Sequence, residues 1–114
     1  MNTPAEGHRN DAVRWDPWVG LIEVSPIGDT FLDQATRAFV WAAVAAQDTA
    51  HFLERVRSAA SEMSLRIESA EDIVPAARSL RAGRNREVRR LVRRALLQPT
   101  EVAWGTFHAY EDDE

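Results

Sequence analysis

Two residue types with distinctive chemistry are missing from the sequence. The 114-residue chain contains no cysteine, so disulfides, thiolate metal ligands and thiol nucleophiles are excluded. All 14 of its basic residues are arginine, and the absence of lysine excludes Schiff-base chemistry. Arginine without lysine in an alanine-rich chain is typical of a GC-rich bacterial genome. The three histidines lack a metal-binding spacing, and no phosphate-loop, dinucleotide or serine-hydrolase motif occurs, so we expect neither metal nor cofactor.

Long apolar segments are also missing. The longest apolar run, residues 38–46, is too short to span a bilayer. Residues 1–16 carry acids and a proline and lack the apolar core of a signal peptide. We therefore expect a cytoplasmic protein without membrane contact. Its size fits one domain, residues 15–110, preceded by a flexible arm (residues 1–14) and followed by an acidic tail (residues 111–114).

Most of the chain can be divided into strands and helices. Residues 18–24 are rich in β-branched side chains and predict a strand, and residues 65–70 alternate as a half-exposed strand does. Residues 37–46 could be a buried strand or part of a buried helix. Asp48 favours the strand, because it is a good N-cap for a helix that starts after the apolar run and reaches Met63.

The C-terminal third predicts a helix over residues 85–97 and a last strand over residues 102–110. Pro75 can open a short helical turn before that helix. The helix has an apolar stripe with helical spacing, formed by Val88, Leu91, Val92, Ala95 and Leu96. Pro99 ends it.

The element order β-β-α-β-α-β indicates an α+β fold. We predict a two-layer sandwich, with a four-stranded mixed sheet and two main helices on one face. Residues 37–70 should form a right-handed crossover whose two strands are parallel and paired.

Charge is strongly segregated along the chain. Seven arginines and one glutamate fall within residues 81–94, which gives +6, whereas the other seven arginines and 17 acids give −10. A solvated helix face, a site for nucleic-acid phosphates, and a docking surface for an acidic partner or the acidic tail all fit this pattern. The candidate binding residues are Arg86, Arg89, Arg90, Arg93 and Arg94.

The last strand carries a second candidate surface. Strand alternation places Trp104, His108 and Tyr110 on one face, which Trp41 and Phe39 could extend. Such a face becomes a dimer interface, a partner surface or a pocket wall if the helices leave it open, and core if they cover it. Near the N-terminus, Trp15 and Trp18 could either anchor the arm or contact a partner.

No catalytic motif is present, so the sequence predicts a small non-catalytic binding protein, of a regulatory, accessory or immunity type. It would act through a protein partner or self-association. The first alternative is a cofactor-free enzyme of the dimeric α+β barrel kind, with His108 as its catalytic residue in an aromatic pocket. The second is nucleic-acid binding through the arginine-rich helix.

Overall fold

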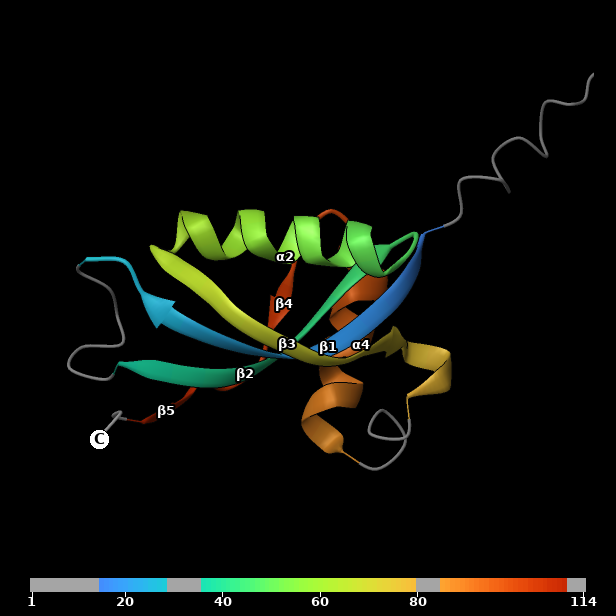
Figure 1. Ribbon diagram of the computed structural model, residues 1–114. Coiled ribbons are helices and arrows are strands. Elements are labelled where there is room, and N and C mark those ends of the chain that lie inside the picture. Colours follow the sequence, from blue (N-terminus) through green and yellow to red (C-terminus); the bar gives the residue numbers. More distant parts are fainter. Residues whose placement is uncertain (1–14, 29–35, 80–84, 111–114) are drawn as a thin grey trace, which may run out of the picture.

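The computed structural model describes residues 15–28, 36–79 and 85–110, and in them one sheet lies between two helices (Figure 1). Its strands are β1 (Asp16–Pro26), β2 (Arg37–Ala46), β3 (Leu65–Pro75), β4 (Ala103–Trp104) and β5 (His108–Tyr110). The helices are α2 (Thr49–Glu62), the 3-10 turn η1 (Ala76–Arg78) and α4 (Arg86–Leu97). The α+β class and the predicted element order are confirmed. The predicted arm and acidic tail lie outside the described residues.

The sheet is antiparallel at every pairing among the described strands, in the order β3-β1-β2-β4, with β5 also on β2. The predicted mixed sheet is therefore wrong, and so is the predicted pairing of residues 37–46 with residues 65–70. β1 lies between these two strands and pairs with both. β1 precedes β2 in the chain and pairs with it as a long hairpin. β1 therefore occupies the edge of β2 at which a direct crossover would have placed β3.

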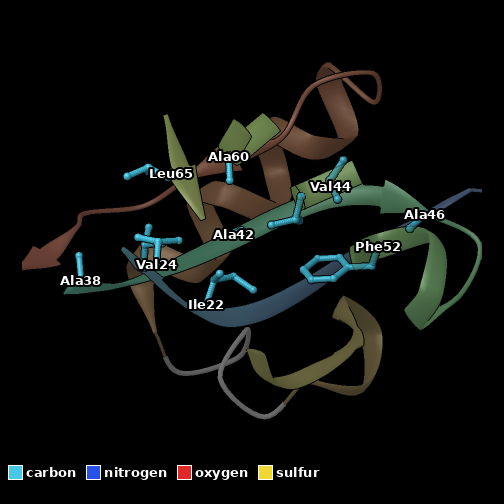
Figure 2. Close-up of a cluster of buried hydrophobic side chains, with 11 residues drawn as sticks. Ile22, Val24, Ala38, Ala42, Val44, Ala46, Phe52, Ala60 and Leu65 are labelled. Atoms are coloured by element: carbon cyan, nitrogen blue, oxygen red, sulfur yellow. The ribbon is translucent and has the colours of Figure 1, made fainter. Parts of the chain in front are cut away.

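The first core lies between α2 and one face of the sheet. Asp48 caps α2 by accepting a hydrogen bond from the His51 N–H at 2.8 Å, as its sequence position predicted. The helix buries Phe52, Val56 and Ala60. Figure 2 shows the Phe52 ring pointing from α2 toward the strand residues beneath it. This core also contains Ile22, Val24, Ala38, Val40, Ala42, Val44, Ala46 and Leu65.

A second core lies on the opposite face of the sheet, under α4. It joins Val88, Leu91 and Ala95 of α4 to Val19, Trp41, Ala43 and Ala103 of the strands. The prediction of both helices on one face is therefore wrong. The physical reason is the composition of β2: residues 38–46 are all apolar, so successive side chains give both faces of the strand a surface that must be covered.

The predicted last strand is broken into β4 and β5. Trp104 pairs with Ala42 and His108 with Phe39, so the three residues between Trp104 and His108 lie opposite only two residues of β2. The extra residue lies in the segment 105–107, where the Gly105 N–H donates to the Trp41 carbonyl at 2.8 Å. A one-residue insertion of this kind moves all following side chains to the other face of the sheet.

Candidate partner-binding surface

Helix α4 presents a continuous row of arginines to solvent. Asn85 caps the helix by accepting a hydrogen bond from the Val88 N–H at 3.1 Å. The helical period then turns one stripe to the sheet and leaves the opposite side exposed. The arginine face, as we define it, consists of the exposed residues Arg86, Arg89, Arg90, Arg93 and Arg94.

These arginines lie close enough to repel one another. Three pairs are spaced i and i+4 along α4, and like charges at that spacing destabilise a helix. The one acid of the helix, Glu87, is engaged elsewhere, since it accepts a hydrogen bond from the Thr106 N–H at 2.6 Å. Within the described residues, Arg86, Arg90, Arg93 and Arg94 form no ion pair with a carboxylate. The face therefore holds positive charge that the described part of the fold does not neutralise.

An apolar groove runs along one flank of the arginine face. It has a volume of about 400 Å³ and lies between α4, η1 and the start of β1. Arg89 and Arg93 line it beside Val92 and Leu96, and its other wall is formed by Pro17, Ala76 and Ala77. We call it the α4–η1 groove. Leu96 and the neighbouring Leu97 are 62% and 75% exposed, so this end of α4 joins apolar surface to positive charge.

The aromatic residues proposed as a common surface do not all lie on one face of the sheet. Trp41 is 9% exposed and forms part of the core under α4. Trp104 lies on the other side of the sheet, half-buried against the α2 core, with its ring 5.8 Å from that of Phe107. The prediction that Trp104 shares a face with Trp41 and His108 is therefore wrong, and the break at residues 105–107 is the reason.

The remaining members of that set are His108 and Tyr110. His108 is exposed on β5, where it pairs with Phe39 on β2, away from Trp104. Tyr110 pairs with Arg37 through its backbone. His108 and Trp104 lie on opposite faces of the sheet, so these two residues do not line one pocket as the enzyme alternative expects.

Trp15 anchors the start of the domain on α2. Its ring makes an edge contact with His51, with 4.8 Å between centroids, and the Arg55 guanidinium lies 5.1 Å from its centre. Arg55 in turn donates to the Ala45 carbonyl at 2.7 Å and the Pro99 carbonyl at 3.0 Å. These contacts support the anchor interpretation. Sequence reasoning missed the role of Arg55, because nothing in a pattern of charges indicates which carbonyls an arginine will reach.

A second, more polar groove of about 640 Å³ lies between α2 and residues 100–104. It carries the acids Glu54, Glu62 and Glu101 together with Arg55 and Trp104. In the part of the chain that the structure describes, no cluster of three histidines or acids is suited to holding a metal ion. This groove therefore supplies acidic surface on the α2 side, opposite the arginine face.

Comparisons with known proteins give no assignment: no family model, no curated protein and no solved structure matches the chain. Neither of the two described helices is long and apolar enough to cross a membrane. Any function must therefore be argued from the surfaces described above.

Proposed function

We propose that the chain is a small non-catalytic binding protein and that the arginine face of α4 docks on an acidic surface of a protein partner. The observation that supports this most is a set of four exposed arginines, Arg86, Arg90, Arg93 and Arg94, that form no ion pair with a carboxylate within the described residues. Guanidinium groups bind carboxylates through two parallel hydrogen bonds, so such a row is suited to a surface rich in Asp and Glu.

The neighbouring surface favours a protein over a nucleic acid. Both would bring negative charge to the arginines, but phosphates offer no match for the exposed Leu96 and Leu97 or for the apolar α4–η1 groove. Protein interfaces combine arginine with apolar contacts in this way. The formal net charge of −4 adds a long-range field that opposes nucleic acid.

The test is capture of a partner from a lysate of the organism that encodes the chain, by photo-crosslinking and mass spectrometry. Three forms are compared: the wild type, a double variant Arg90→Glu and Arg94→Glu, and the control Arg57→Glu on the exposed side of α2. We expect the wild type and the control to capture the same protein and the double variant to lose it. Equal capture by all three forms, or nucleic acid as the main captured species, would contradict the proposal.

A further inference from the structure

The chemistry of the α4–η1 groove identifies the kind of segment that it would bind. Along α4, Val92 and Leu96 are spaced by one turn, and Arg89 and Arg93 form a parallel row beside them. An apolar row and a basic row therefore run side by side on one flank of the helix. The complementary element carries an apolar row beside an acidic row.

We infer that this groove binds an acidic amphipathic helix of the partner protein. Its apolar side chains lie between Leu96 and the wall formed by Ala76, Ala77 and Pro17, and its carboxylates contact Arg93 at the rim. The inference rests on the proposed function, which requires only an acidic surface on the partner. It adds that the bound segment is a helix and that apolar side chains anchor this helix in the groove.

Three features support this occupant. The groove wall is made of small side chains, Ala76 and Ala77, which leave room for larger ones. Leu96 is exposed although it belongs to the apolar stripe of its helix, so it gains burial when a partner covers it. Charge complementarity selects acids, because Arg93 at the rim forms no ion pair within the described residues and Glu87, the one acid of α4, accepts a hydrogen bond from the Thr106 N–H instead. Recognition by a helix laid in a groove uses anchors with this spacing.

The test uses a designed helical peptide of about 14 residues, or four turns. It carries leucines at i, i+4 and i+7 with glutamates beside them. The control peptide has the same composition in scrambled order and so keeps the charge without the stripe. Binding is measured with labelled peptide and the full chain, at low and near-physiological salt. We expect the amphipathic peptide to bind roughly tenfold more tightly than the scrambled one, as expected for burial of one leucine side chain.

Paired variants locate the contact. Leu96→Ser should weaken binding of the amphipathic peptide roughly fivefold to tenfold. Leu97→Ser is the matched control, because Leu97 is exposed at the same helix end but does not line the groove. Ala77→Trp fills the groove and should weaken binding of the same peptide as well. Circular dichroism checks that each variant keeps its helix content.

The outcomes separate the two proposals. If both peptides bind equally and Arg90→Glu with Arg94→Glu weakens both, the arginine face binds acids and the groove inference is wrong. If Leu96→Ser and Leu97→Ser weaken the amphipathic peptide equally, the groove is not the contact. If neither peptide binds, the inference is overturned, whereas the crosslinking experiment still decides the proposed function.

Discussion

Replacing Arg90 by glutamine should make the protein more stable. Arg90 lies one turn from Arg86 on one side and from Arg94 on the other, so the change removes two like-charge pairs at i and i+4. It also removes a like-charge pair with Arg93 at i+3 and an opposite-charge pair with Glu87 at i−3, and these two contributions offset each other. Each such pair costs about 0.2–0.5 kcal/mol on an exposed helix. Glutamine has nearly the helix propensity of arginine, so little is lost in exchange. The expected gain is about 0.4–1 kcal/mol at low ionic strength.

The measurement is urea unfolding followed by tryptophan fluorescence, at low and at high salt. The gain should shrink toward zero at high salt, because screening removes repulsion between exposed charges. Arg57→Gln is the matched control on α2: like Arg90, Arg57 has a glutamate at i−3, Glu54, but it has no arginine at i−4 or i+4, so this variant should be neutral or slightly destabilising. If Arg90→Gln destabilises the protein in a salt-dependent way, Arg90 has a carboxylate partner within the chain, such as the acidic tail, and the face is not free for a partner.

Two further variants test the packing that supports this surface. Phe52→Ala should cost about 3–5 kcal/mol in chemical denaturation, because the Phe52 ring is fully buried between α2 and the sheet, and a loss below about 2 kcal/mol would contradict that placement. Asn85→Ala should cost about 0.5–2 kcal/mol by removing the N-cap of α4, and circular dichroism should show some loss of helix. Unchanged stability would mean that another group caps the helix.

The helices could be predicted because their signals are local. Asp48 and Asn85 each stand at the start of an apolar stripe with helical spacing, and each caps its helix in the structure. The strand at residues 37–46 followed from the first cap, since a helix that begins after Asp48 separates the apolar run from it. These features depend on residues within a few turns of one another.

The arrangement of these elements depends on long-range pairing, which local patterns do not encode. Nothing in residues 18–24 indicates that β1 inserts between β2 and β3. The uniform apolar run in β2 did indicate helices on both faces. A strand that is buried on one face only has alternating apolar and polar residues, and β2 has no polar residue between positions 38 and 46. The predicted two-layer sandwich did not take this indication into account.

The candidate site was partly predictable for the same reason. The exposed arginines follow from the helical period once Val88, Leu91 and Ala95 are buried. The α4–η1 groove does not, because Pro17 and the alanines of its wall lie far from α4 in sequence and carry no chemical pattern. The prediction that Trp104 and His108 share a face was wrong because one extra residue between them reverses the face, and sequence alternation assumes an unbroken strand.

The central claim is that the arginine face is the partner-binding surface, and arginine footprinting tests it most directly. A dicarbonyl reagent labels exposed guanidinium groups, and the absence of lysine leaves the arginines as its main targets. The chain is labelled alone and with the captured partner, and each site is quantified by mass spectrometry. We predict that Arg90, Arg93 and Arg94 are labelled in the free chain and protected in the complex, while Arg57 and Arg66 are labelled equally in both. Protection of Arg57 or Arg66 with continued labelling of α4 would contradict the account.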